Sequence, residues 1–185
     1  ETYDHIREAL SFLGEPKIKQ KRNNNTLIFR MESEIPPVVP IHLKIEINCK
    51  EHFNVLPMQK IPFSVSNKWY KGGCDVLTYQ LDELVGTKLR ALYQRRKGRD
   101  LYDLYKALTT KELNIVNVLK CYNLYMDFVV DHIPTYKEFI INMEDKMQDE
   151  EFLGDTKQLL RPDEHFNPQE GYEVVKTALI DRLQK

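Results

Sequence analysis

The chain has 185 residues, of which 42% are hydrophobic and 30% are charged; this composition favours a folded globular protein and excludes an intrinsically disordered one. The formal net charge is −1, so nucleic-acid binding would need a local basic patch rather than the bulk charge. The sequence shows neither an apolar run near the roughly 18 residues of a membrane span nor a signal-peptide pattern, and we therefore expect a cytoplasmic protein without a membrane partner.

The first half of the chain is predicted to be rich in β-strands. Apolar residues at helical spacing predict an opening helix over Thr2–Leu13, which Gly14 ends. The clearest strand is Ile41–Cys49, where apolar and polar residues alternate, so that Glu46 and three other polar side chains share one face. The remaining elements expected here are a polar stretch at Lys17–Asn25, strands at Thr26–Met31, Ile61–Ser66 and Cys74–Tyr79, and a turn at Gly72–Gly73.

The second half is predicted to be helical. Leu81–Gln94 carries apolar residues at helical spacing and has Asp82 and Glu83 in its first turn, where carboxylates favour the helix dipole. A break at Arg96–Gly98 follows. Further helices are expected over Arg99–Leu108, Asn114–Asp131, Thr135–Glu150, Phe152–Leu160 and Gln169–Gln184. The charged run Glu144–Glu151 is interpreted as a solvated helix end.

This order of elements predicts an α+β fold, because strands come first and helices second. We expect two domains, a sheet-bearing one over residues 1–80 and a helical one over residues 81–185.

The densest charged feature is the segment Lys88–Asp103. Asp100 and Asp103 are three residues apart on an expected helix and therefore share a face. The six basic residues of the segment are Lys88, Arg90, Arg95, Arg96, Lys97 and Arg99. One interpretation is that these charges only complement the dipoles of two successive helices. The other is a binding site, because Lys88 lies among apolar neighbours and basic side chains before a glycine turn suit phosphate contact.

Glu46 is the second candidate. It lies in the middle of the alternating strand, on the face that also carries His42, Lys44 and Asn48. A solvent-exposed sheet face explains these residues. A carboxylate in mid-strand is nevertheless disfavoured by strand propensity, and acidic residues hold Mg²⁺ ions in two-metal phosphoryl transfer.

The chain resembles a known family in residues 81–108, LDELVGTKLRALYQRRKGRDLYDLYKAL. This segment is similar to the signature of the AbiEii/AbiGii-type nucleotidyltransferases, the toxins of type IV toxin–antitoxin and abortive-infection systems. The matching positions are Lys88, Leu89, Ala91, Arg95, Arg99, Asp100, Asp103 and Leu104. The strand IHLKIEIN also resembles a family strand, with Glu46 at its acidic position.

The resemblance implies a DNA polymerase β-like nucleotidyltransferase that transfers a nucleotide from an NTP to an acceptor such as tRNA, with Mg²⁺. A cognate antitoxin is the implied partner. In this family Glu46 would be the third catalytic carboxylate and a metal ligand, and Lys88 would contact the triphosphate. Asp100 and Asp103 would form the distal acidic motif. The residues that would support phosphate or nucleic acid are Arg95, Arg96 and Arg99.

One departure from the family pattern affects these expectations. The family's Gly-rich helix start and Asp-x-Asp strand are not found in the sequence, so we expect an incomplete nucleotidyltransferase sheet, truncated at its amino end and inactive by itself. An exposed sheet edge of that kind predicts a homodimer. The alternative is a non-catalytic relative that acts as a nucleic-acid or antitoxin binding module.

Overall fold

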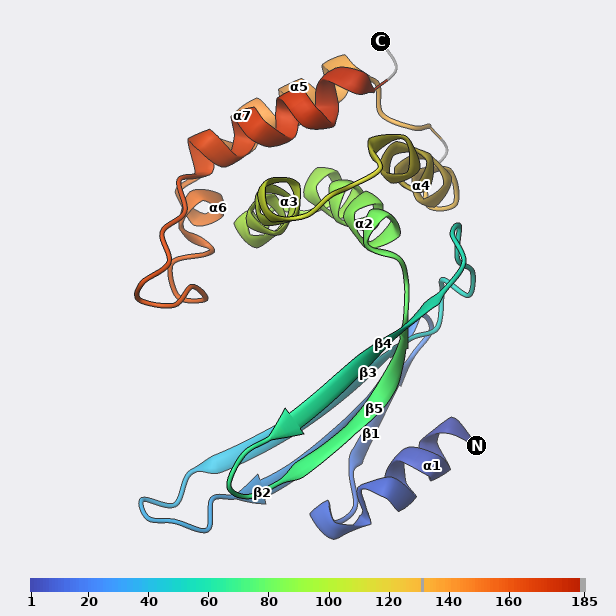
Figure 1. Cartoon of the computed structure of the whole chain (residues 1–185), viewed down its shortest axis with the longest axis vertical. Coiled ribbons are helices and arrows are strands. Elements are labelled where there is room, and N and C mark those ends of the chain that lie inside the picture. The colour runs from blue at the N-terminus through green and yellow to red at the C-terminus, as the bar shows by residue number, and fades with distance from the viewer. Residues whose placement is uncertain (131, 184–185) are drawn as a thin grey trace. The chain divides into compact units, whose positions relative to one another are not determined.

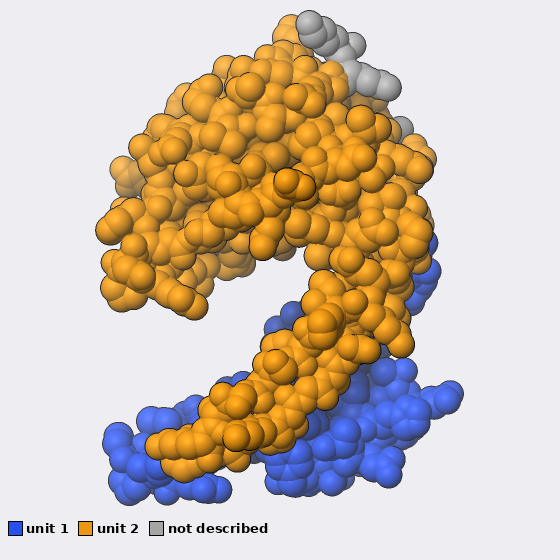
Figure 2. Space-filling view, in the orientation of Figure 1, with its two compact units in different colours: residues 1–53 blue, residues 54–185 orange. Residues whose placement is uncertain are grey.

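The computed structural model describes residues 1–130 and 132–183 (Figure 1), and the chain forms two compact units, Glu1–Phe53 and Asn54–Lys185 (Figure 2). After the opening helix, five strands precede the remaining helices along the chain, so the expected α+β class is confirmed. The two units meet between Phe53 and Asn54. The domain boundary that the sequence predicts, between residues 80 and 81, stays a prediction.

The first unit contains a helix and a three-stranded antiparallel sheet in the order β1-β2-β3. Its elements are α1 (Thr2–Ala9), the 3-10 turn η1 (Ser11–Leu13), β1 (Lys17–Lys21), β2 (Asn24–Glu32) and β3 (Pro40–Asn48). Leu27 and Phe29 of β2 are fully buried and form the apolar centre of the unit. Gly14 ends the opening helical segment with φ 79°, a left-handed conformation that glycine adopts without steric cost.

Strand β1 lies where the sequence indicates only a polar stretch. All five of its residues are exposed, so no alternation of apolar and polar residues marks it. Its pairing with β2, from Lys17 opposite Ile28 to Lys21 opposite Asn24, holds it in the sheet instead. An edge strand with two exposed faces is therefore invisible to a pattern search.

The second unit begins with the antiparallel hairpin of β4 (Gln59–Ser66) and β5 (Lys71–Thr78). The expected turn at Gly72–Gly73 is wrong, because both glycines lie inside β5. The hairpin reverses direction at residues 67–70, where the Asn67 N–H donates to the Tyr70 carbonyl at 2.9 Å. Gly72 serves another purpose: a Cβ at this position would collide with the Tyr70 ring.

The helical part packs around α2 (Figure 1). Its helices are α2 (Leu81–Gln94), α3 (Gly98–Thr110), α4 (Ile115–Asp127), α5 (Tyr136–Lys146), α6 (Glu150–Gly154), α7 (Pro168–Ala178) and the 3-10 turn η2 (Ile180–Arg182). Both bounds of α2 agree with the prediction. Helix α6 ends at Gly154, well before the expected Leu160. The expected helix ends at Asp131 and Gln184 lie outside the described residues.

Polar side chains fix where several helices begin. Asn114 and Asn167 accept hydrogen bonds from the first backbone N–H groups of α4 and α7. Thr135 and Glu138 form a reciprocal capping box at the start of α5. Such caps satisfy donors that have no partner inside the helix, and each contributes roughly 1 kcal/mol.

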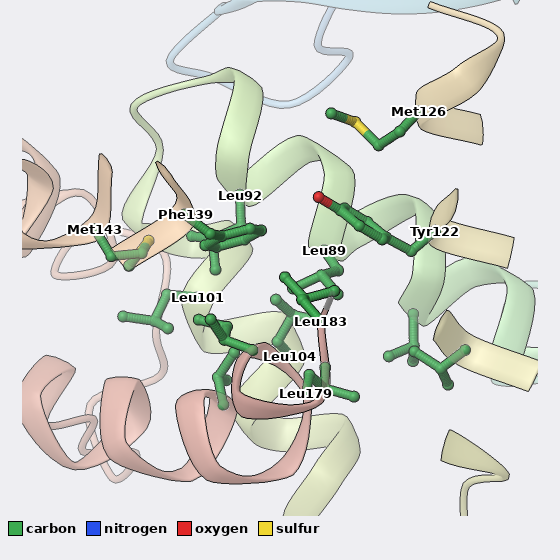
Figure 3. Packing of buried hydrophobic residues seen from close by; sticks show 14 of the residues in the cluster. Leu89, Leu92, Leu101, Leu104, Tyr122, Met126, Phe139, Met143, Leu179 and Leu183 are labelled. Carbon is green, nitrogen blue, oxygen red and sulfur yellow. The ribbon is translucent and has the colours of Figure 1, made fainter. Parts of the chain in front are cut away.

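A single hydrophobic cluster joins these helices (Figure 3). Leu89 and Leu92 of α2 are fully buried in it together with Leu101 of α3, Tyr122 of α4 and Phe139 of α5. Each such side chain contributes about 1.5–3 kcal/mol on burial. The cluster therefore fixes α2 and α3 against each other and against the rest of the helical part.

A buried carboxylate ties the hairpin segment to the helices. Glu83 of α2 is fully buried, and its two oxygens accept hydrogen bonds from the backbone N–H groups of Val55 and Leu56, each at 2.8 Å. The Tyr125 hydroxyl donates to the same carboxylate at 2.7 Å. Because of these bonds, the segment that begins at Asn54 belongs to the same unit as α2.

Helices α2 and α4 approach closely at Gly86, and this contact yields a stability prediction. A Cβ at Gly86 would lie 2.7 Å from the Val118 carbonyl oxygen and 2.8 Å from the Cys121 Cβ. Alanine normally stabilises a helix interior by about 1 kcal/mol relative to glycine. Here we expect Gly86→Ala to destabilise by about 1–3 kcal/mol through overpacking, measured as a lower urea midpoint.

The matched control is Gly154→Ala, because no atom lies within 4 Å of a Cβ at that position. An unchanged or higher midpoint in Gly86→Ala would contradict the close packing of the two helices.

Candidate functional site

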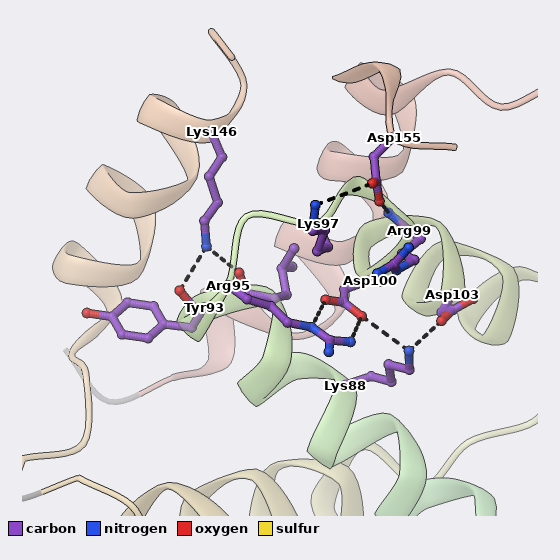
Figure 4. A network of polar contacts seen from close by, with 10 residues as sticks. Lys88, Tyr93, Arg95, Lys97, Arg99, Asp100, Asp103, Lys146 and Asp155 are labelled. Atoms are coloured by element: carbon purple, nitrogen blue, oxygen red, sulfur yellow. Dashed lines mark hydrogen bonds and ion pairs between the residues drawn. The ribbon is translucent and has the colours of Figure 1, made fainter. Parts of the chain in front are cut away.

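The candidate site is a polar cluster at the junction of α2 and α3, drawn in Figure 4. Lys88 lies in α2, and Arg95 directly follows the end of that helix. Asp100 and Asp103 lie in the first two turns of α3. A connection of three residues reverses the chain here, because α2 ends at Gln94 and α3 begins at Gly98. Four of the eight charged residues that the sequence singled out in this segment are thus brought together.

The centre of the cluster is Asp100, which is fully buried. Its two oxygens accept from Arg95 in a bidentate pair, Nε to Oδ2 at 2.5 Å and Nη2 to Oδ1 at 2.6 Å, and Lys88 Nζ donates to Oδ1 at 3.2 Å. Burial by itself would raise the pKa of Asp100, but the hydrogen bonds and charges of Arg95 and Lys88 outweigh it and lower the pKa below its ordinary value. The carboxylate therefore stays ionised.

Lys88 is oriented by two carboxylates. Its Nζ lies 3.2 Å from Asp100 and 2.6 Å from Asp103 Oδ2. The side chains of Lys88 and Asp103 are 36% and 43% exposed, so the ammonium lies at the surface. An ammonium has three donors, and the two aspartates occupy two of them. The arrangement can offer the remaining donor to an anionic ligand.

Arg96 and Lys97 point to other acidic residues. Arg96 donates to Asp145 at 2.5 Å and to Asp149 at 2.9 Å, and these bonds raise its pKa. Lys97 Nζ lies 3.7 Å from Glu151 and 3.9 Å from Asp155. These pairs connect the α2–α3 junction to α5 and α6, which is a structural role that does not require a ligand.

Arg99 differs from its basic neighbours. Its backbone N–H donates to Asp155 at 3.1 Å, whereas its guanidinium has no acceptor within hydrogen-bond distance in the described part of the chain. The exposed side chain lines a surface hollow of about 420 Å³, whose other charged residues are Glu151 and Asp155. Among the arginines expected to contact phosphate, Arg99 is the one whose guanidinium carries no ion pair.

Lys146 belongs to this region and was missed by the sequence analysis, which took Glu144–Glu151 as solvated. The side chain is 2% exposed, and its Nζ donates to the Leu92 carbonyl and, at 2.8 Å, to the Tyr93 carbonyl at the end of α2 (Figure 4). Burial lowers the pKa of Lys146 to about 8. A sequence signal existed, because Lys146 continues the helical spacing of the buried Phe139 and Met143.

Glu46 lies on β3 in the first unit, whereas the cluster belongs to the second. It is half exposed and forms an ion pair with Lys44 at 2.6 Å. Within residues 1–130 and 132–183, no group of three or more His, Cys, Asp or Glu side chains is arranged to hold a metal ion. The metal-binding role of Glu46 therefore stays a prediction.

The buried Asp100 carboxylate predicts a loss of stability in acid. We expect Asp100→Asn to lower the free energy of unfolding at pH 7 by about 1–3 kcal/mol, because Lys88 and Arg95 lose their charged partner. Since the folded pKa is depressed, the stabilisation is present above the unfolded pKa of about 3.9 and is lost as the pH falls through the folded value. Urea unfolding at several pH values measures this.

Asp103→Asn is the control, because an exposed ion pair contributes only about 0–1 kcal/mol. Equal losses in the two variants, or a loss in Asp100→Asn that does not shrink in acid, would contradict the buried-carboxylate interpretation.

Lys146 predicts a second rise of stability with pH, in the alkaline range, because burial disfavours its charged form. Its folded pKa of about 8 lies below the unfolded value of about 10.4, so the folded protein gains stability as the pH rises between these values. We expect Lys146→Met to lose this gain, and the difference in unfolding free energy between variant and wild type measures it. A difference that is constant from pH 7 to pH 10 would show that Lys146 is not buried as a charge.

Comparison with known proteins completes the description of the site. No helix in the described parts of the chain has the length and apolar character to cross a membrane. No curated protein and no solved structure matches the chain. The model of the family described as "Nucleotidyl transferase AbiEii toxin, Type IV TA system" matches residues 2–178, which include the whole polar cluster. The chain therefore belongs to the AbiEii nucleotidyltransferase toxin family of type IV toxin–antitoxin systems.

Proposed function

We propose that this toxin transfers a nucleotide from an NTP to a nucleic-acid acceptor, with tRNA as the first candidate, and that Lys88 contacts the triphosphate. The supporting observation is the surface ammonium of Lys88, which two carboxylates orient while one donor remains for a ligand. The family is one of nucleotidyltransferases, and the resemblance of residues 81–108 to its signature implies that Lys88 is the motif lysine.

The chemistry assigns distinct roles to the cluster. The acceptor hydroxyl attacks the α-phosphorus and releases its proton to solvent, the bond from that phosphorus to the oxygen that bridges the α- and β-phosphates breaks, and pyrophosphate leaves. Negative charge grows on the leaving group, where Lys88 and the unpaired guanidinium of Arg99 would stabilise it. Asp100 is a positioning residue, because it is fully buried and acts through Lys88 and Arg95.

Magnesium enters the proposal with the NTP, whose phosphates bind it. Glu46 is proposed as one carboxylate near the ion, although it forms an ion pair with Lys44 in the free chain. The described residues contain no group of three or more His, Cys, Asp or Glu side chains that could hold a metal ion. We therefore assign the chain no step that passes through a metal.

A second candidate function is a binding module without catalysis. The observation that favours it is the number of ion pairs within the segment, since Arg95 and Arg96 are both engaged by carboxylates of the same chain. In that case the cluster would hold α3, α5 and α6 in place, and nucleic acid or the antitoxin would be the ligand. The homodimer expected from the sequence is compatible with either function.

The test is transfer of radiolabel from NTP to total tRNA with Mg²⁺. It uses the natural protein in full length. We expect Lys88→Ala to lower the rate by about 10²–10³-fold, the loss that follows removal of one preorganised donor to a developing anion. Lys88→Arg should retain more activity because it keeps the charge.

Lys137→Ala is the matched control, since Lys137 is exposed on α5. Equal labelling by Lys88→Ala and wild type would remove Lys88 from the site. A folded wild-type protein that labels nothing with any NTP would favour the binding module.

A further inference from the structure

The tip of the β4–β5 hairpin, residues 67–71, presents two aromatic side chains to solvent. Trp69 is 81% exposed and Tyr70 is 63% exposed. Trp69 is also the only tryptophan among the 185 residues. Large aromatic side chains usually dominate cores and interfaces, so an adjacent exposed pair at a strand reversal marks a surface that suits a ligand with flat apolar faces.

The tip is held in one conformation by its own hydrogen bonds. The Asn67 side-chain oxygen accepts from the backbone N–H groups of Trp69 at 2.9 Å and Tyr70 at 2.8 Å. The Asn67 N–H donates to the Tyr70 carbonyl at 2.9 Å. The Tyr70 ring lies against Gly72, where no side chain interferes. A ligand would therefore meet a backbone turn that is already formed and that sets the direction in which both rings project.

The charge around the tip is positive. Lys68 and Lys71 lie at the tip itself, and the nearest carboxylate of the hairpin is Asp75, four positions along β5 opposite Pro62. Lys68 Nζ lies 4.0 Å from the centre of the Trp69 ring, a cation–π contact that keeps an ammonium beside the indole face. Exposed aromatic rings beside cations are the combination with which proteins bind single-stranded nucleic acid, because bases stack on the rings and phosphates contact the cations.

We propose that the hairpin tip binds single-stranded nucleic acid, with bases stacked on Trp69 and Tyr70 and phosphates on Lys68 and Lys71. This inference deepens the proposed function and rests on it, because it gives the nucleic-acid acceptor a contact site separate from the cluster at Lys88. The expected recognition is tolerant of sequence, since every base has a face that can stack.

The experiment measures anisotropy of a fluorescein-labelled, single-stranded RNA 12-mer with the full-length protein at several salt concentrations. Trp69→Ala should weaken binding by roughly 5- to 150-fold, as loss of base stacking does elsewhere. The double variant Lys68→Gln, Lys71→Gln should reduce the slope of log affinity against log salt by about 1.4, because two phosphate contacts are lost.

The controls are Phe12→Ala, an aromatic residue that is 78% exposed outside the hairpin, and Lys137→Gln. Both should bind RNA as wild type does. Unchanged RNA affinity in Trp69→Ala, or no RNA binding by wild type, overturns the proposal. A change of oligomeric state in Trp69→Ala, seen by light scattering with RNA affinity unchanged, overturns it in favour of a protein contact.

Label transfer measured on the same proteins separates the two hypotheses. If wild type and Trp69→Ala transfer label equally and bind RNA with equal affinity, the hairpin contact is contradicted and the proposed enzyme activity is not. RNA binding that depends on Trp69 without any label transfer contradicts the enzyme and supports the hairpin contact.

Discussion

The fully buried carboxylate of Asp100 is the interaction on which the candidate site depends. A charge in this position is tolerated only because Arg95 binds both of its oxygens and Lys88 adds a third hydrogen bond. The same three contacts fix the reversal between α2 and α3. They also direct the Lys88 ammonium toward the surface between Asp100 and Asp103. Stability of the junction and orientation of the proposed triphosphate contact therefore have one physical cause.

Two further buried charges, Glu83 of α2 and Lys146 of α5, form hydrogen bonds that hold other segments against α2. Near its start Glu83 holds the backbone of Val55 and Leu56, and at its end Lys146 binds the carbonyls of Leu92 and Tyr93. Buried charges of this kind contribute little net stability, but removing one partner is costly. The hydrophobic cluster supplies the stability, and the charged contacts determine which segments lie beside α2. Helix α2, which carries Lys88, is consequently fixed near both of its ends.

The parts of this arrangement that were predictable are those with local signals. Apolar spacing located both bounds of α2, and a separation of three residues placed Asp100 and Asp103 on one face. The exposed strand β1 was not predicted because its pairing with β2, and not burial of its side chains, holds it in the sheet. Burial of Glu83 was not predicted because its backbone partners lie 27 and 28 residues away along the chain. Lys146 has partners 53 and 54 residues away, and its helical spacing with Phe139 and Met143 was the one local signal of its burial. Gly72 was taken for a turn because its purpose, room for the Tyr70 ring, is a tertiary one.

The central claim is that Lys88, and not simply any cation of the segment, contacts the triphosphate. Calorimetric titration of the full-length protein with a non-transferable NTP analogue and Mg²⁺ tests this most directly. It would compare Lys88→Gln with Lys97→Gln, whose ammonium faces Glu151 and Asp155 instead. The account predicts that Lys88→Gln weakens binding at least about 10-fold, the loss of one charge-assisted hydrogen bond, while Lys97→Gln binds as wild type does. Equal affinities for wild type and Lys88→Gln would contradict it.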